Sequence, residues 1–156
     1  MSSLAGETAR RLAAMTDAAD FERLASAVLR RARPAVYGNI SHPGTQPGGK
    51  TVPAPFDNVG WVNTPGGSTF VCAAHSTTEQ NKLDGKWLHD PATVTPRGAS
   101  GRPTQPAGDL VKGIEEITAL RAAHPELISV VFALTTNRET PADVRTAAEA
   151  LATRHN

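Results

Sequence analysis

The sequence predicts an α/β fold with a mixed central sheet that contains an antiparallel hairpin and is flanked by helices. Two apolar runs, FDNVGWV and STFVCAAH, stand on either side of the turn TPGG, which is typical of a β-hairpin. A long amphipathic segment then precedes a third apolar run, LISVVFAL, and a helix that leads into a strand favours parallel pairing. A doubly wound nucleotide-binding fold is the main competitor, but no glycine fingerprint leads from a strand into a helix here.

Two helical segments are expected before the hairpin. A weaker helix covers residues 3–15, and a stronger one covers residues 20–32, where apolar side chains recur at the spacing of one helix face. Pro34 ends the second helix. We therefore assign residues 1–19 to an N-terminal helical extension and residues 20–156 to one domain.

The hairpin turn fixes which residues of the two strands face each other. A two-residue turn at Pro65-Gly66 sets Asp57 opposite Ala74, and a turn at Gly66-Gly67 sets Asp57 opposite Ser76. Because opposed residues share a face of the sheet, both registers predict that Asp57, Ala74 and Ser76 lie on one face. The same argument turns His75 to the other face.

A short helix is expected after the hairpin. Ser76, Thr77 or Thr78 is a suitable helix cap, and Glu79 in the first turn complements the helix dipole. Lys82 and Lys86 are four residues apart and therefore share a helix face, which suits a bound phosphate or is simply a solvated surface.

The C-terminal half predicts helix, strand and helix. An amphipathic helix covers residues 109–123, and the apolar run 127–134 has the length of a strand covered on both faces, so we expect it at the centre of the core. A final helix runs from the Thr140-Pro141 cap to about residue 153. Another strand normally follows such a helix, which leaves open that the chain is a fragment of a longer protein.

The composition limits the class of protein. The 156 residues include 16 Lys and Arg against 15 Asp and Glu, so phosphate recognition must come from local clusters and not from a general basic field. The single cysteine, Cys72, excludes an internal disulfide and fits a reducing cytosol. No stretch is long and apolar enough for a membrane span, and the N-terminus lacks the apolar core of a signal peptide. We expect a cytoplasmic protein without a membrane partner.

The hairpin with Asp57 at its open end resembles the PD-(D/E)XK, or restriction endonuclease-like, nuclease superfamily, and the surrounding elements resemble an N-terminal nuclease-like domain of large bacterial proteins of defence and restriction. In that superfamily a carboxylate near the start of one strand and an acid-x-lysine triplet near the end of its hairpin partner hold Mg²⁺ against the scissile phosphate. Here the triplet position reads Ala74-His75-Ser76, so only Asp57 matches. Since Mg²⁺ needs oxygen ligands, Ala74 leaves one ligand position without an acid.

The resemblance implies roles for further residues. Lys86 or Lys82 would supply the lysine that positions the attacking water, and Glu22 or Glu79 would supplement Asp57 as ligands of Mg²⁺. Lys50, in a glycine-rich loop, and the arginines of a Pro/Gly-rich segment, Arg97 and Arg102, are the candidates for contacts to nucleic acid. The segment of Arg97 and Arg102 is equally well explained as a surface loop with incidental charge, and a plain loop is the favoured explanation for the segment of Lys50.

Three functions follow for testing. The first is a Mg²⁺-dependent DNA endonuclease domain of a bacterial defence system, impaired as written because Ala74 occupies the second acidic position. The second is a non-catalytic nuclease-like module that binds nucleic acid or assembles larger subunits, as a homo-oligomer or beside further domains of a defence protein. The third and weakest is a zinc site of His42, His75 and His89, which no ligand spacing supports.

Overall fold

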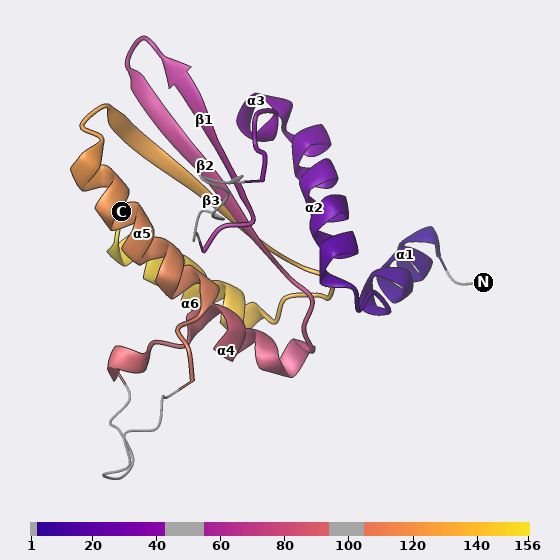
Figure 1. Ribbon diagram of the computed structural model, residues 1–156. Helices are drawn as coiled ribbons and strands as arrows, with labels where there is room; N and C mark the ends of the chain where they lie inside the picture. Colours follow the sequence, from indigo (N-terminus) through magenta and orange to yellow (C-terminus); the bar gives the residue numbers. More distant parts are fainter. Residues whose placement is uncertain (1–2, 43–54, 94–104) are drawn as a thin grey trace, which may run out of the picture.

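A three-stranded sheet with helices on both faces forms the centre of the structure, a computed structural model that describes residues 3–42, 55–93 and 105–156 (Figure 1). The strands are β1 (Asn58–Thr64), β2 (Gly67–Ser76) and β3 (Leu127–Thr136), in the order β1-β2-β3. β1 pairs antiparallel with β2, and β2 pairs parallel with β3. The predicted α/β fold with a mixed sheet is confirmed.

The hairpin has the first of the two predicted registers. Thr64 pairs with Gly67 and Asn58 pairs with Ala73, so Pro65-Gly66 is the turn. Gly67 has a φ of +141°, a backbone conformation that residues with a Cβ rarely adopt. A Cβ there would also lie 2.9 Å from the carbonyl oxygen of Glu126, so both the turn and the neighbouring strand require glycine.

Helices cover the two faces of the sheet. One face carries α2 and α3, and the other carries α5 and α6, with α4 at the end of the sheet (Figure 1). Asp17 caps α2 by accepting the backbone N–H of Asp20, and Pro34 begins α3 directly after α2 ends. The helices are α1 (Leu4–Ala13), α2 (Ala18–Ala32), α3 (Pro34–Tyr37), α4 (Leu83–Leu88), α5 (Asp109–Ala123) and α6 (Ala142–Arg154), with single 3₁₀ turns at Gln80–Lys82 and Pro91–Thr93.

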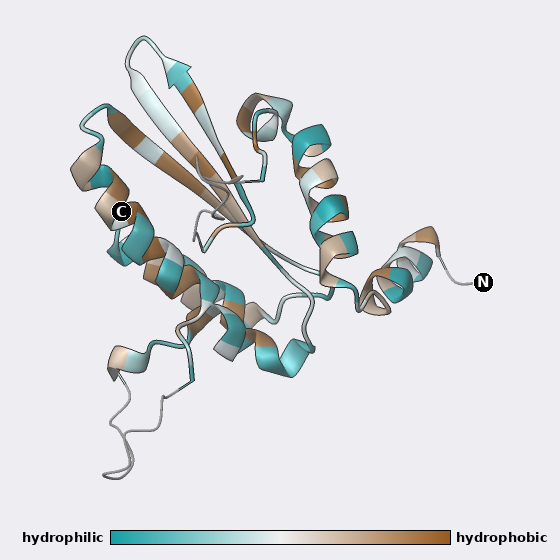
Figure 2. Ribbon diagram, viewed as in Figure 1, coloured by the Kyte–Doolittle hydropathy of each residue, from teal (hydrophilic) through white to brown (hydrophobic). Residues whose placement is uncertain are grey.

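The core lies on both sides of β2. Alternate residues of β2 point to opposite faces, so Phe70 and Cys72 pack with Ile117 of α5, whereas Val71 packs with Tyr37 of α3. Cys72 and Ala73 have no exposed surface, and Figure 2 shows hydrophobic residues along the strands. The buried apolar area of both layers is the main stabilising contribution to the fold.

The position of β3 differs from the prediction. Its apolar run was expected at the centre of the core, but β3 lies at the edge of the sheet and β2 occupies the centre. The side chains of β3 are only half-buried or exposed, and Ile128 is 62% exposed. The uninterrupted apolar run of β3 therefore indicates a strand that has contacts on both of its faces. It does not indicate that this strand is the central one of the sheet.

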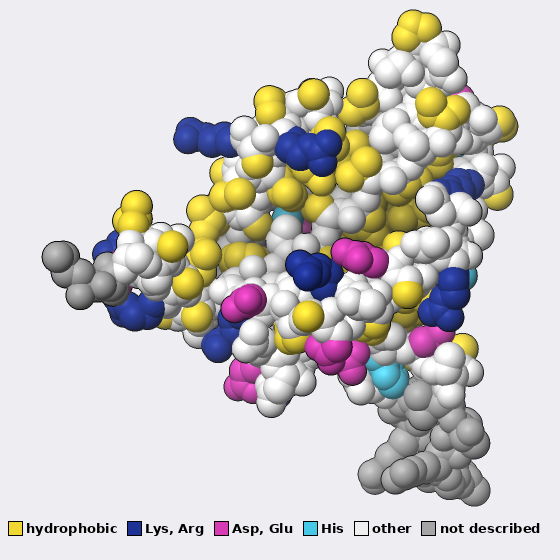
Figure 3. Space-filling model, turned by 180° about the vertical axis from the view of Figure 1, so that it is seen from behind, with side chains coloured by type: hydrophobic (Ala, Val, Ile, Leu, Met, Phe, Trp, Pro, Cys, Tyr) yellow, Lys and Arg dark blue, Asp and Glu magenta, His cyan; other side chains and the backbone are white. Residues whose placement is uncertain are grey.

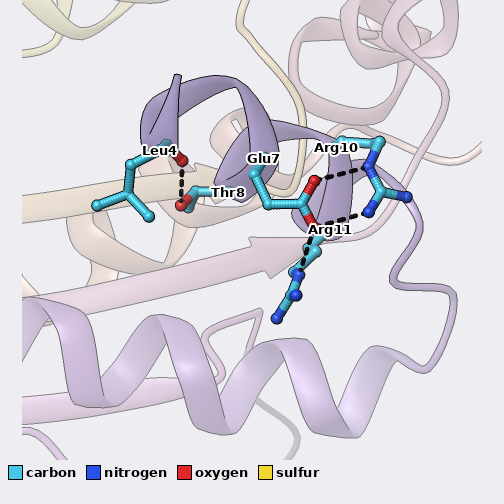
Figure 4. A network of polar contacts seen from close by, with 5 residues as sticks. All are labelled: Leu4, Glu7, Thr8, Arg10 and Arg11. Carbon is cyan, nitrogen blue, oxygen red and sulfur yellow. Dashed lines mark hydrogen bonds and ion pairs between the residues drawn. The ribbon is translucent and has the colours of Figure 1, made fainter. Parts of the chain in front are cut away.

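The N-terminal helix α1 is tied to the domain by Asn137, whose side-chain amide donates to the carbonyl oxygens of Leu12 and Met15. On its exposed surface Glu7 accepts hydrogen bonds from Arg10 and Arg11 (Figure 4). These two guanidinium groups lower the pKa of Glu7.

Gly113 gives a test of the packing between α5 and the sheet. A Cβ at Gly113 would lie 2.3 Å from the ring of Phe132 and 3.1 Å from the ring of Phe56. We expect Gly113→Ala to lower the free energy of unfolding by about 1–3 kcal/mol through overpacking, although alanine is the better helix former. In Gly6→Ala, the matched control on α1, the new Cβ meets only Ser3 Oγ at 3.5 Å. Urea unfolding of both variants should show destabilisation in Gly113→Ala alone, and equal stability of the two would contradict the packing argument.

Candidate functional site

Polar residues gather at one end of the sheet. The C-terminal ends of the parallel strands β2 and β3 lie together there, and the antiparallel strand β1 begins beside them. The buried polar residues of the described chain all lie at or near this end: Ser26, Asn58, His75, Ser76 and Asn137. In open α/β sheets the carboxyl ends of the parallel strands are the common place for a ligand.

His75 is the centre of a hydrogen-bond network on the α2 face. Its Nε2 lies 2.7 Å from Asn58 Oδ1, and its Nδ1 lies 2.6 Å from Thr135 Oγ1. Ser26 of α2 donates to the same Asn58 oxygen. Asn58 Oδ1 can only accept, so Nε2 of His75 carries a proton and donates to it. In the neutral imidazole Nδ1 then has no proton and accepts from the Thr135 hydroxyl. The network thus joins all three strands to α2.

Burial lowers the pKa of His75, and the negative charge of Asp57 offsets part of this shift. His75 is 8% exposed, and Phe21 of α2 contacts its ring edge-on. A proton on Nδ1 would also displace the hydrogen bond that the Thr135 hydroxyl donates. Both effects favour the neutral imidazole.

Asp57 precedes the first residue of β1, and its carboxylate ends the ladder of the hairpin. Asp57 donates its backbone N–H to the carbonyl oxygen of Ala73 at 2.8 Å, a bond that departs from the hairpin register, because Ala73 is already the partner of Asn58. Asp57 Oδ2 accepts the backbone N–H of His75 at 2.7 Å. The carboxylate therefore satisfies a strand N–H where the paired part of β1 has ended.

The Asp57 carboxylate lies on the α2 face, beside Glu22. Burial and then the charge of Asp57 raise the pKa of Glu22, while His42 and Arg23 lower it by smaller amounts. Together these groups line a cleft of about 480 Å³, here called the α2 cleft. Its lining residues are Ala19, Glu22, Arg23, Ser26, Arg30, His42, Asp57 and Asn58.

Position 74 does not face the α2 cleft. The paired residues end at Asn58 and Ala73, so Ala74 and Asp57 do not pair. Ala74 is 2% exposed and stands in β2 between Cys72 and Ser76, both of which contact the α5 side. The predicted common face of Asp57, Ala74 and Ser76 is thus not observed for Asp57. The reason is local: alternation applies to paired strand residues, and Asp57 lies outside the ladder.

The α5 face of the sheet end carries a separate charged cluster. Ser76 Oγ donates to Asp109 Oδ2 at 3.2 Å, and Lys86 Nζ lies 3.8 Å from the same oxygen. Lys112 Nζ lies 3.7 Å from Asp109 Oδ1. Lys86, a candidate for the catalytic lysine, is therefore paired with Asp109 and not with Asp57.

The other predicted site residues are not brought to Asp57. Glu79 and Lys82 form an exposed ion pair of 3.0 Å, and Glu79 lines a different pocket together with Arg138. Of the predicted metal ligands, only Glu22 accompanies Asp57 in the α2 cleft. Lys50, Arg97 and Arg102 lie outside the described residues.

Ser26, Asn58 and Asp109 were not predicted as members of a site. Asn58 had a usable signal, because a polar residue at the start of an apolar strand needs a hydrogen-bond partner when it is buried. Ser26 contacts Asn58 across 32 positions, a pairing that no local pattern contains.

Comparisons with known proteins identify no relative: no family model, no curated protein and no solved structure matches the chain. Across the described parts of the chain, no group of three or more His, Cys, Asp and Glu residues is arranged to hold a metal ion. No helix within residues 3–42, 55–93 or 105–156 has the length and apolarity needed to cross a membrane.

The His75 network predicts a pH dependence of stability. The pKa of His75 is lower in the folded protein than the ordinary value of 6.5, so below that value the unfolded chain binds the proton first. The contribution of neutral His75 is complete above about pH 6.5 and is lost as the pH falls toward the folded pKa. We expect the free energy of unfolding, measured in urea between about pH 5 and about pH 8, to decrease on the acid side.

His75→Gln should remove part of this acid slope, whereas His155→Gln, which changes an exposed histidine near the end of α6, should retain it. The same slope in His75→Gln and in the unchanged protein would show that His75 is not the group responsible.

Asp57 predicts a second effect on stability. Asp57→Ala leaves the N–H of His75 without its carboxylate acceptor, so we expect a loss of about 1–2 kcal/mol in the free energy of unfolding. Asp57→Asn keeps an oxygen acceptor and should lose less. Glu115→Ala, at an exposed position of α5, is the control for removal of an acid and should change stability little. Equal stability of Asp57→Ala and the control would exclude the ladder-ending role.

Proposed function

We propose that this chain is a nuclease-like module that binds nucleic acid at the α2 cleft and does not cleave it. The observation that carries the proposal is the separation of positions 57 and 74 onto different sides of the sheet. Asp57 lines the α2 cleft, whereas the buried Ala74 belongs to the α5 side. A second acid at position 74 would therefore not share a metal ion with Asp57 in this arrangement. The resemblance to the PD-(D/E)XK superfamily also suggests a cytoplasmic protein of bacterial defence.

The lining of the α2 cleft supports recognition of a phosphate backbone. Arg23 and Arg30 from α2 and His42 from the following segment line the cleft, together with Asn58 and the carboxylates of Glu22 and Asp57. Arg23 pairs with Asp20 on an exposed surface, and Arg30 Nε donates to the carbonyl oxygen of Ile40. Arginine binds phosphate oxygens through several parallel donors, which makes it the natural contact residue.

The lysines support the absence of catalysis. Cleavage in the superfamily requires a lysine near the metal ion and the attacking water. Lys86 pairs with Asp109 on the α5 face, and Lys82 pairs with Glu79. Neither lysine lines the α2 cleft.

A second candidate is the Mg²⁺-dependent DNA endonuclease, and the proximity of Glu22 to Asp57 favours it. Two carboxylates beside a cleft meet the usual requirement of Mg²⁺, which takes one or two carboxylates and completes its shell with water and phosphate oxygens. Asp57 Oδ2 already accepts the N–H of His75, so each acid would offer Mg²⁺ at least one oxygen. Mg²⁺ bound there would polarise a phosphate oxygen.

The first experiment measures binding to a short DNA duplex and to a single strand over a series of salt concentrations. We expect affinity that falls with salt, and Arg23→Gln should weaken binding and reduce the salt slope by about one phosphate contact. Arg145→Gln on α6, which lies on the other side of the sheet, is the matched control and should bind as the unchanged protein does. No binding to either nucleic acid would refute the proposed module.

Plasmid cleavage with Mg²⁺ separates the two candidates. The non-catalytic module predicts no cleavage and binding that does not depend on Mg²⁺, and Ala74→Glu should destabilise the protein without restoring activity, because a buried carboxylate is costly. The endonuclease, impaired as written by Ala74, predicts weak cleavage that Asp57→Asn and Glu22→Gln both abolish.

A further inference from the structure

A second pocket lies on the α5 face of the sheet, between the hairpin and α5. Its volume is about 550 Å³, and pockets of roughly 300–1,000 Å³ are typical of sites for small molecules. Among the described residues, none lines both this pocket and the α2 cleft. The chain has four Phe, two Trp and one Tyr, and three of these rings, Phe56, Trp61 and Phe70, line the pocket. It is here called the aromatic pocket.

Cross-strand pairing sets the aromatic rings side by side. Trp61 of β1 and Phe70 of β2 are partners in the hairpin register, and their ring centroids lie 5.1 Å apart. Phe56, which precedes β1, packs against Phe70 with a centroid distance of 5.8 Å. Phe56 and Phe70 are buried, whereas Trp61 is only half-buried. Trp61 therefore presents part of its indole ring to the aromatic pocket.

The helix α5 forms the opposite wall of the aromatic pocket. Glu116, Leu120 and His124 follow one another at intervals of four residues, so they share the helix face that borders the hairpin. Glu116 is exposed, and within the described residues its carboxylate has no hydrogen-bond or ion-pair partner. This wall thus adds a free negative charge to the apolar lining.

A second carboxylate is held at the same rim. The carbonyl oxygen of Glu126 accepts the backbone N–H of Ser68 at 2.9 Å, which fixes the segment after α5 against the hairpin. His124 Nδ1 lies 2.9 Å from Glu126 Oε1, and the His124 ring contacts Trp61 with a centroid distance of 5.4 Å. A backbone hydrogen bond and the His124 side chain lower the pKa of Glu126, so its carboxylate is charged at neutral pH.

The combination of aromatic rings and acids distinguishes this pocket from other apolar surface. Figure 3 shows hydrophobic side chains also on the face of the molecule opposite to that of Figure 1, with basic and acidic side chains among them. Exposed apolar area alone is therefore not diagnostic here. Among the described residues, no Lys or Arg lines the aromatic pocket, whereas two carboxylates do. Such a lining repels an anion and attracts a cation.

The chemistry of the lining selects the kind of cation. The face of an aromatic ring attracts a positive charge, and tryptophan does so best. A hydrated metal ion would exchange water for ring surface that offers no oxygen ligands. A cation whose nitrogen carries methyl groups keeps apolar contact with the rings and still pairs with the carboxylates.

We propose that the aromatic pocket binds a small organic cation with a methylated nitrogen, of the choline class. The methyl groups pack on the ring of Trp61 and on Leu120, and Glu116 and Glu126 balance the charge. The lining also contains Asn63, a polar partner for the hydroxyl group of such a molecule. This site is independent of the function proposed for the α2 cleft.

The test compares choline with its neutral carbon analogue, the alcohol that has a tert-butyl group in place of the trimethylammonium group. Isothermal titration calorimetry of the full chain measures both affinities. We expect choline to bind on the order of tenfold more tightly, because only the cation gains from the rings and the carboxylates. Equal affinity for the two molecules, or no binding of choline up to about 10 mM, overturns the proposal.

Variants of the lining locate the binding. Glu116→Gln should weaken choline binding about threefold and leave binding of the neutral analogue unchanged. Glu115→Gln, at the neighbouring exposed acid of α5 that does not line the pocket, is the matched control and should bind as the unchanged protein does.

Trp61→Leu keeps an apolar side chain but removes the indole ring, and it should weaken choline binding about fivefold. Circular dichroism checks that this variant is folded, and the exposed position of Glu116 makes Glu116→Gln a test that does not depend on it. Choline affinity that neither substitution changes would mean that the cation binds elsewhere, and the inference fails.

Discussion

The need to satisfy buried polar groups at one end of the sheet is the constraint on which the rest of this structure depends. His75 is buried between β1, β3 and α2, and a buried imidazole is tolerated when both of its nitrogens have partners. Asn58, Thr135 and Ser26 meet this requirement, and each comes from a different element. The network therefore sets the positions of α2, β1 and β3 relative to β2. Apolar packing alone would allow these elements to slide past one another.

The two faces of the sheet end have different chemistry because β2 alternates. His75 joins the α2 face, and Ser76, one residue later, joins Asp109 and its lysines on the α5 face. Polar groups that follow one another in the sequence thus serve two separate surfaces. This separation is the physical basis for favouring a binding module over a nuclease, since a metal-dependent site needs its acids and its lysine on one side.

The sequence predicted the parts of this fold that depend on local periodicity. The turn residues and the alternation predicted the hairpin and left two registers open, one of which is the observed pairing of Asn58 with Ala73. The helix spacing predicted α2 and α5 closely. Strand order was not predictable, because the apolar run of β3 looks the same at the centre and at the edge of a sheet. The direction of Asp57 was not predictable either, because the strand pattern no longer constrains a side chain just outside the ladder. The closeness of Glu22 to Asp57 depends on how α2 packs, which one sequence does not contain.

Cys72 lies at the centre of the middle strand, with no exposed surface, and burial raises the pKa of its thiol. It is the only sulfhydryl group of the chain. A thiol reagent reaches it only after the α5 side of the core has opened, so the native protein withstands alkylation and oxidation that would modify an accessible cysteine. The chain therefore carries at its centre a chemical marker for opening of the α5 side of its core, which needs no added label.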